Sequence, residues 1–519
     1  MTEKLTHRQI LLIYSGLMLG MLLAALDQTI VSTALPTIVR EIPGGSVSRL
    51  SWVVTAYLLA STISQPIYGK LGDLYGRKRL FQIAIVIFLI GSALCGISQN
   101  MDQLIVFRGL QGLGAGGLMV GALSIIGDIV SPRERGRYQG YMGGVFAFAS
   151  VVGPLVGGFL TQHASWRWVF YVNIPVGIVA LVVVAIVLPQ TTTRRSHRID
   201  YAGAVALAFG AGLITLGLTW GGTEYPWGSK QIVACFVGGF VAVVAFVAIE
   251  RVASEPLIPL RLFRISTFTT ASTMSFLVGM SMFGALVFLP LFLQVVYGAT
   301  PTVSGLKLLP LMAGVLGASI LGGRAISKLG RYRAFPIVGT ALMTVGMWML
   351  SRVGVSTSYV VLSAAMLVLG IGLGLVMPVL VLAVQNAVPA SDLGVATAAS
   401  TFFRSIGGSF GVAIFGAIFA NRLAYWLPRT LPASAGLNAT AANGLLRSGP
   451  AALDKLPPAV HNGLLEAFAN ALHSVFFLAV PFGIAAFVVS LLLREVPLRE
   501  RGAASVAAAS ADTSGEAAA

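Results

Sequence analysis

The sequence has few charged residues and almost no cysteine. Lys and Arg (34) and Asp and Glu (18) make up 10% of its 519 residues, whereas a soluble domain carries roughly 25%. The two cysteines, Cys95 and Cys235, each lie alone in an apolar stretch, which argues against a fold held by disulfides. No G-x-x-x-x-G-K-[ST] phosphate loop occurs, so direct use of ATP is disfavoured. These absences together argue against a water-soluble enzyme.

Apolar residues are what the sequence has in abundance. They make up 56% of the chain, and the mean hydropathy is +0.87. A helix needs about 20 apolar residues to cross roughly 30 Å of hydrocarbon. Fourteen stretches of this kind predict an all-α integral membrane protein with fourteen transmembrane helices. The stretches span residues 10–36, 52–69, 80–97, 104–129, 138–161, 168–188, 201–220, 232–249, 268–296, 303–326, 335–351, 359–388, 395–420 and 471–493.

The positive charges alternate between the two sides of this predicted bundle. If the N-terminus lies inside, the inner segments hold 22 Lys and Arg residues and the outer segments hold 9. Because short loops rich in Lys and Arg stay in the cytoplasm, we expect a multi-pass protein of the inner or plasma membrane with both termini cytoplasmic. The net charge of +16 would then anchor the chain to anionic headgroups. No basic module suggests a nucleic-acid partner.

The chain contains an internal repeat. Residues 69–81 return 254 positions later as residues 323–335, with five of thirteen positions identical. The same offset relates two glycine pairs, Gly153 with Gly407 and Gly157 with Gly411. This repetition predicts two six-helix bundles, a common plan for transporters. The bundles cover residues 10–188 and 268–493, and two inserted helices cover residues 201–249. A chance likeness between two basic loops is the alternative.

Four motifs follow one another in a specific order. The loop between helices two and three reads Gly69-Lys70-Leu71-Gly72-Asp73-Leu74-Tyr75-Gly76-Arg77-Lys78-Arg79. Helices one, four and five carry Leu26-Asp27-Gln28-Thr29-Ile30-Val31 with Leu35-Pro36, Arg108 with Gln111-Gly112 and Gly114, and Gly153-Pro154 with Gly157-Gly158. These motifs resemble those of the fourteen-helix drug:proton antiporters of the major facilitator superfamily, over residues 10–495. The resemblance implies alternating access of two bundles around a central cavity, with export driven by inward proton flow.

Asp27 is the only acidic residue well inside any of the fourteen stretches. An ionised carboxylate at that depth costs roughly 2.5 to 3.5 kcal/mol on insertion scales, so it needs a partner, water or a proton. Asp27 is therefore our candidate for the proton-coupling group. A permanently ionised carboxylate that only clamps neighbouring helices is the alternative.

Three cations also lie inside the predicted helices. Arg108 is the candidate partner of Asp27, because it is always charged; the alternative is that its head reaches the nearby outer interface. Lys307 and Arg404 sit one or two turns inside their helices. For these two we expect the charged head to snorkel to the interface.

Two motifs have a mechanical interpretation. In helix five, Pro154 removes a backbone hydrogen bond and so kinks the helix. The glycines Gly153, Gly157 and Gly158 allow another helix to approach closely. A kinked, tightly packed helix five would seal the two bundles against proton leak. Ordinary close packing is the alternative.

The helix-two loop motif begins at Gly69, and Gly76 within it suits a tight turn. Asp73, Arg77 and Arg79 are candidates to latch helix ends through charge and helix dipoles. The second copy has Ser327 where Asp73 stands, so any latch is asymmetric.

The substrate is less well defined by the sequence. Candidate residues of an adaptable apolar cavity are Gln28, Gln111, Met280, Phe283, Phe402 and Phe403. Helix packing or contact with lipid is the alternative for most of them. Because no second membrane acid is present, we expect lipophilic small molecules that are monovalent cations or neutral compounds. No cofactor or metal is expected, since the proton gradient supplies the driving force. We expect a monomer that is surrounded by the lipid bilayer.

Other interpretations remain open. A lipid exporter on the same scaffold is the main alternative. An intramembrane hydrolase would use Ser409 of a Gly407-x-Ser409-x-Gly411 pattern, but no histidine lies mid-span to act as its base. The outer loop, residues 421–470, either meets an envelope partner or is a solvated connector. The tail, residues 502–519, is rich in Ala and Ser and is expected to be disordered.

Overall fold

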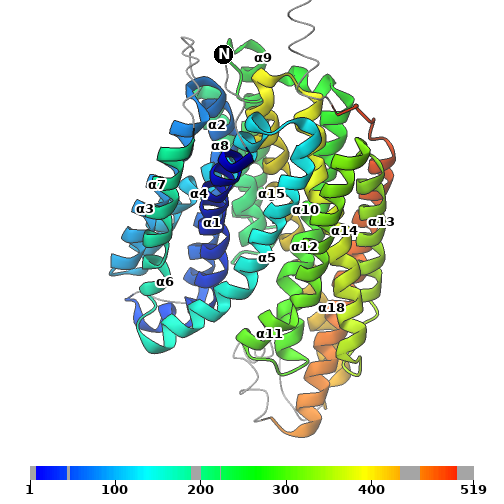
Figure 1. Cartoon of the computed structure of the whole chain (residues 1–519). Coiled ribbons are helices and arrows are strands. Elements are labelled where there is room, and N and C mark those ends of the chain that lie inside the picture. The colour runs from blue at the N-terminus through cyan, green and yellow to red at the C-terminus, as the bar shows by residue number, and fades with distance from the viewer. Residues whose placement is uncertain (1–6, 44–46, 189–199, 223, 433–455, 499–519) are drawn as a thin grey trace, which may run out of the picture.

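The computed structural model describes residues 7–43, 47–188, 200–222, 224–432 and 456–498. Within these ranges the chain is helical, and no strand is formed (Figure 1). The N half contains α1 (His7–Glu41), α2 (Val47–Tyr75), α3 (Arg77–Ile97), α4 (Met101–Ile129), α5 (Pro132–His163), α6 (Trp168–Tyr171) and α7 (Asn173–Val187). Next come α8 (Tyr201–Trp220) and α9 (Lys230–Val252). The C half contains η1 (Leu260–Arg264), α10 (Ser266–Val295), α11 (Pro301–Lys307), α12 (Leu309–Leu329), α13 (Ala334–Leu350), α14 (Tyr359–Ala387), η2 (Ala390–Asp392), α15 (Leu393–Thr430) and α18 (Pro458–Leu491).

A helix lies at each of the fourteen predicted stretches, but the count of fourteen spans is not confirmed. Twelve helices in the described ranges are long and apolar enough to cross a membrane; α2 and α13 are not among them. Helix α13 has only 17 residues. Helix α2 has a polar centre, with Ser61, Thr62, Ser64 and Gln65 buried against protein. These polar side chains face neighbouring helices, chiefly α4 and α15, and not lipid. They lower the mean hydropathy of α2.

Each half packs mainly within itself. In the N half α4 packs on α2 and α3, and α1 packs on α5; in the C half α10 packs on α15, and α14 packs on α12 and α13. The halves meet along two seams, α5 with α12 and α2 with α15. The pair α8–α9 packs together, and α8 also touches α2 and α15. The inserted pair therefore borders the α2–α15 seam.

The closest contacts between the halves lie at one end of the molecule. We call the end where α2 meets α3 the basic end, and the opposite end the distal end. At the basic end a Cβ on Gly69 would lie 2.4 Å from the Ala398 Cβ, and one on Gly323 would lie 2.1 Å from the Gly136 carbonyl oxygen. Toward the distal end, where α6 and α11 lie, the helices of the two halves fan apart (Figure 1).

The predicted outer loop, residues 421–470, is wrong in its boundaries. Helix α15 continues to Thr430, and α18 already begins at Pro458. The Arg429 guanidinium lies 3.6 Å from the ring centre of Tyr425, a side-chain contact one turn away along the helix. The helix can therefore continue past its apolar stretch. Residues 433–455 and the predicted tail lie outside the described residues.

Candidate functional site

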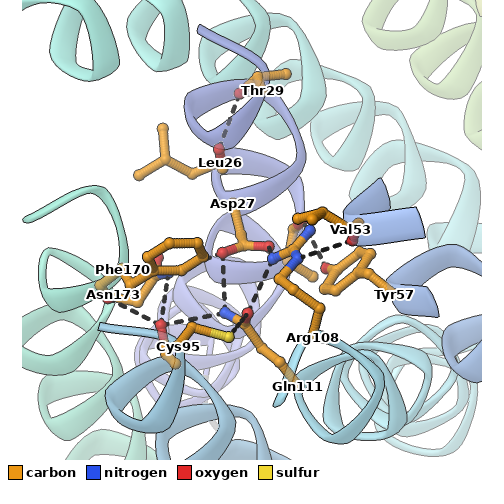
Figure 2. A network of polar contacts seen from close by, with 12 residues as sticks. Leu26, Asp27, Thr29, Val53, Tyr57, Cys95, Arg108, Gln111, Phe170 and Asn173 are labelled. Atoms are coloured by element: carbon orange, nitrogen blue, oxygen red, sulfur yellow. Dashed lines mark hydrogen bonds and ion pairs between the residues drawn. The ribbon is translucent and has the colours of Figure 1, made fainter. Parts of the chain in front are cut away.

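The site is centred on an ion pair buried inside the N half. Asp27 on α1 is fully buried, and Arg108 on α4 is 2% exposed. The Arg108 Nη1 atom lies 2.5 Å from Asp27 Oδ2, and the two residues are drawn in Figure 2. The head of Arg108 therefore points into the bundle and does not reach the outer interface. The structure brings together the two charged residues that the sequence singled out.

Two amides complete the coordination of the carboxylate. Asp27 Oδ1 accepts hydrogen bonds from Gln111 Nε2 at 2.8 Å and from Asn173 Nδ2 at 3.1 Å (Figure 2). Both amides also donate to the Ser92 hydroxyl, at 3.1 Å each, and that hydroxyl donates to the Phe170 carbonyl at 2.8 Å. Each carboxylate oxygen thus has at least one donor, which a buried charge requires.

The guanidinium is held independently of Asp27. Arg108 donates from Nε to the Val53 carbonyl at 3.3 Å and from Nη1 to Gln111 Oε1 at 2.8 Å. Its Cζ lies 4.2 Å from the ring centre of Tyr57. The ring face contributes a cation–π attraction. These contacts hold Arg108 in addition to its ion pair with Asp27.

Glycines on α3 and α4 allow this arrangement. A Cβ on Gly91 would lie 2.6 Å from the backbone nitrogen of Gln111, and one on Gly112 would lie 2.3 Å from the Tyr57 carbonyl oxygen. Without side chains at these two positions, α4 approaches both α2 and α3 closely. The approach places Arg108 and Gln111 beside Asp27.

Sequence reasoning missed part of this network. Asn173, Ser92 and Tyr57 were not singled out, and Cys95, treated as a core residue, donates to Gln111 Oε1 at 3.7 Å. The available signal was a polar side chain in an apolar stretch. Serines and amides occur in many such stretches, so the signal does not single out these residues.

The helix-two loop binds the C half at the basic end. Asp73 accepts hydrogen bonds from the backbone N–H groups of Gly394 at 3.1 Å and Val395 at 3.0 Å, at the start of α15. Its carboxylate also pairs with Arg77 at 2.7 Å, and Arg77 pairs with Asp128 at 2.9 Å. A carboxylate at a helix N-terminus is stabilised by the helix dipole. This contact links α2, α4 and α15 at the basic end.

The other residues of that motif play smaller parts. Gly76 has φ 91°, a conformation that favours glycine, between α2 and α3. Arg79 is exposed at the surface. Ser327, at the position equivalent to Asp73, bonds the Gly323 carbonyl of its own helix at 3.0 Å, while its carbonyl accepts from Arg133 at 3.1 Å. The two copies of the loop therefore make different contacts.

The helix-five motif packs mainly on α1. A Cβ on Gly153 would lie 2.0 Å from the Thr29 hydroxyl, and one on Gly157 would lie 2.6 Å from the Ile30 carbonyl oxygen. On the side of α11 in the C half there is more room: a Cβ on Gly305 would lie 3.8 Å from Pro154, and one on Gly158 would lie 3.9 Å from the Thr302 hydroxyl. The motif fixes α5 next to the Asp27 segment and borders the C half on its other side.

The predicted cavity residues are scattered. Gln111 is fully buried in the Asp27 network, so it does not line a central cavity. Met280 and Phe402 are buried in the C half, where helices α10 and α15 pack closely. Phe283 and Phe403 are half-buried, and Gln28 is exposed.

The charged head of Lys307, which was expected to snorkel to the interface, packs against two aromatic rings. Its ammonium lies 4.9 Å and 5.1 Å from the ring centres of Tyr297 and Tyr359, near the distal end. Ser409 donates to the Ser405 carbonyl of its own helix at 3.3 Å, which is an ordinary helical contact.

Comparisons with known proteins agree with this fold. The family model of the Major Facilitator Superfamily matches residues 17–412. The chain is 37% identical to Multidrug transporter protein MdtP of Bacillus subtilis (strain 168), over 95% of this chain and 94% of that one. It is 43% identical to an uncharacterized MFS-type transporter of Mycobacterium tuberculosis (strain ATCC 25618 / H37Rv), over 94% of this chain and 70% of that one. Among solved structures, the proton:xylose symporter XylE is similar with a TM-score of 0.62 at 15% identity, over 94% and 96% of the two chains.

Proposed function

The chain belongs to the major facilitator superfamily of transporters, and on that premise we propose that it exports lipophilic small molecules in exchange for protons. It is a transporter and not an enzyme. Relatives named Multidrug transporter protein and Multidrug resistance protein 3 support a drug-like range of substrates. The relatives named above give the lipid-exporter alternative no support.

The observation that carries the proposal is the buried Asp27–Arg108 pair. A proton that binds Asp27 neutralises the carboxylate and removes the attraction across the 2.5 Å contact. Arg108, still held by Val53 and Tyr57, then has no counter-charge in a medium of low dielectric. The N half then favours a conformation that gives Arg108 water or another partner. Proton binding in this way shifts the balance between two states of the transporter.

Alternating access accounts for the arrangement of the two halves. We place the basic end in the cytoplasm, since its loops carry most of the Lys and Arg residues. The contact between Asp73 and the start of α15 then closes the cytoplasmic side. On this proposal the structure corresponds to the state closed toward the cytoplasm, and α2 and α13 also cross the membrane to give fourteen spans with both termini inside.

The test is uphill transport by the purified full chain in proteoliposomes. A fluorescent lipophilic dye and an imposed pH gradient are supplied, and dye accumulation and proton release are both recorded. We expect Asp27→Asn to abolish uphill accumulation and proton release, while facilitated downhill movement of the dye persists. Asp102→Asn, at an exposed acid near the start of α4, is the matched control and should behave as wild type, as should Ser409→Ala. Uphill pumping by Asp27→Asn at the wild-type rate would refute proton coupling through this residue.

A further inference from the structure

Arg404 lies in the first third of α15, a helix that is long and apolar enough to cross a membrane. The helix begins at Leu393, so at 1.5 Å per residue Arg404 is about 16 Å along it. The hydrocarbon core has a half-thickness of roughly 15 Å. The sequence placed this arginine one or two turns inside its helix and expected it to snorkel. In α15 it lies about three turns from the first residue, farther in than the sequence predicted, so a snorkelling head would have to reach back over that distance.

The guanidinium of Arg404 is enclosed by protein but not fully covered. Protein atoms surround it densely, yet the residue keeps an intermediate exposure. A side chain that faced lipid would have protein on one side only. Dense surroundings with some remaining surface are typical of a residue that lines an interior recess.

Within the described ranges, Arg404 has no partner for its charge. The side chain takes part in none of the ion pairs, hydrogen bonds or ring contacts there. The other two cations that the sequence placed inside helices differ, because Arg108 pairs with Asp27 and Lys307 lies over two tyrosine rings. Unpaired charges inside membrane proteins are costly and mark pathways for substrates or ions.

The neighbourhood of Arg404 belongs to both halves. A Cβ on Gly279 of α10 would lie 2.2 Å from the Arg404 carbonyl oxygen, so α10 and α15 touch at this level. From the N half, Gln65 of α2 donates to the hydroxyl of Ser405 at 3.3 Å, and the Gln65 amide oxygen is buried without a partner. Arg404 thus directly precedes a residue of the α2–α15 seam, and that seam also holds an amide oxygen without a partner. This seam must rearrange if the halves rock.

We propose that Arg404 binds an oxyanion of the substrate, so that this transporter exports lipophilic monoanions such as aromatic or aliphatic carboxylates. The inference rests on the proposed function and names its substrate class. Arginine stays charged under all cellular conditions and binds a carboxylate through two parallel hydrogen bonds. A fixed positive charge repels the monovalent cations that the sequence alone suggested. The seam that holds Arg404 couples the bound anion to the movement of both halves.

Two matched fluorescent compounds test the proposal, a lipophilic carboxylic acid and its neutral primary amide. Their binding to the purified full chain in detergent and their efflux in proteoliposomes are both measured. We expect wild type to prefer the acid. Arg404→Gln should weaken binding of the acid at least tenfold and change binding of the amide less than twofold. Arg404→Lys keeps the charge, so it should retain the preference at reduced affinity, and Arg251→Gln, at an exposed arginine, is the control.

The outcomes separate this inference from the proposed function. An equal loss of acid and amide binding in Arg404→Gln would assign the residue a structural role and overturn the inference. Unchanged acid binding would overturn it as well. If Arg404→Gln does not fold, Arg404→Lys is used instead, and a loss of its preference for the acid over the amide would also overturn the inference. Selective binding of the acid without efflux under a pH gradient would instead reject the proposed function and leave the anion site in place.

Discussion

The buried pair of Asp27 and Arg108 leads to a prediction about stability that is independent of transport. Either residue can be neutralised alone, by Asp27→Asn or Arg108→Gln, or both can be neutralised together. Each single change leaves one buried charge without its counter-charge, whereas the double change leaves none. The three variants and wild type form a double-mutant cycle.

The expected magnitudes follow from the burial of the two side chains. Asp27 is 0% exposed and Arg108 is 2% exposed. Removal of one partner from such a pair costs roughly 3–5 kcal/mol, because the remaining charge is desolvated and unpaired. In Asp27→Asn the new amide group also points a donor at the guanidinium if its oxygen keeps the bonds from Gln111 and Asn173. We expect the double variant to be at least as stable as either single variant.

The assay is equilibrium unfolding of the purified chain in mixed micelles, followed by tryptophan fluorescence. Independent effects would make the double variant about 6–10 kcal/mol less stable than wild type, the sum of the two single costs. That additive result would refute the reasoning, since it would mean that the two charges do not compensate each other. Uphill efflux should be absent from all three variants, because none retains both the carboxylate and the cation.

Three further predictions concern the surroundings of this pair and the basic end. Asn173→Leu removes a donor to a buried carboxylate and should lower the free energy of unfolding by about 1.5–3 kcal/mol in the same titration; an unchanged value would show that the bond contributes nothing. Asp73→Asn removes the charge that caps α15, so a cysteine introduced as Ala398→Cys at the seam should react faster with a thiol reagent, and equal rates would contradict the latch. Lys70 pairs with Glu255 at 2.7 Å and is partly exposed, so Lys70→Gln should lower the free energy of unfolding by about 1 kcal/mol or less. Lys70→Glu should cost more and be rescued by Glu255→Lys, and a failure of that rescue would argue against the pair.

The fold was largely predictable from the hydropathy pattern. A helix lies at each apolar stretch because hydrocarbon offers no hydrogen-bond partner to the backbone, so a spanning segment must satisfy its own groups. The helix ends were less predictable. Helix α15 extends to Thr430 although its last turns include exposed positions that carry charged side chains, so the hydropathy pattern does not mark where the helix ends.

The candidate site was predictable only in part. Asp27 and Arg108 stood out because a charge inside an apolar stretch is expensive and therefore rare. Asn173 and Ser92 did not, because an amide or hydroxyl costs little enough to occur in many helices. Gln111 was assigned to a cavity, although it binds the Asp27 carboxylate.

The sequence by itself determined that this chain is a bundle of membrane-crossing helices, and which of its charges must be explained. The tertiary structure alone decided how those charges are used: Asp27 and Arg108 compensate each other, Asp73 caps a helix of the other half, and Arg404 has no partner in the described part of the chain. The physical reason is that hydropathy depends on each segment's own transfer from water to lipid. Pairing depends on which helices lie side by side, and close contacts at glycines such as Gly91 and Gly112 set that arrangement.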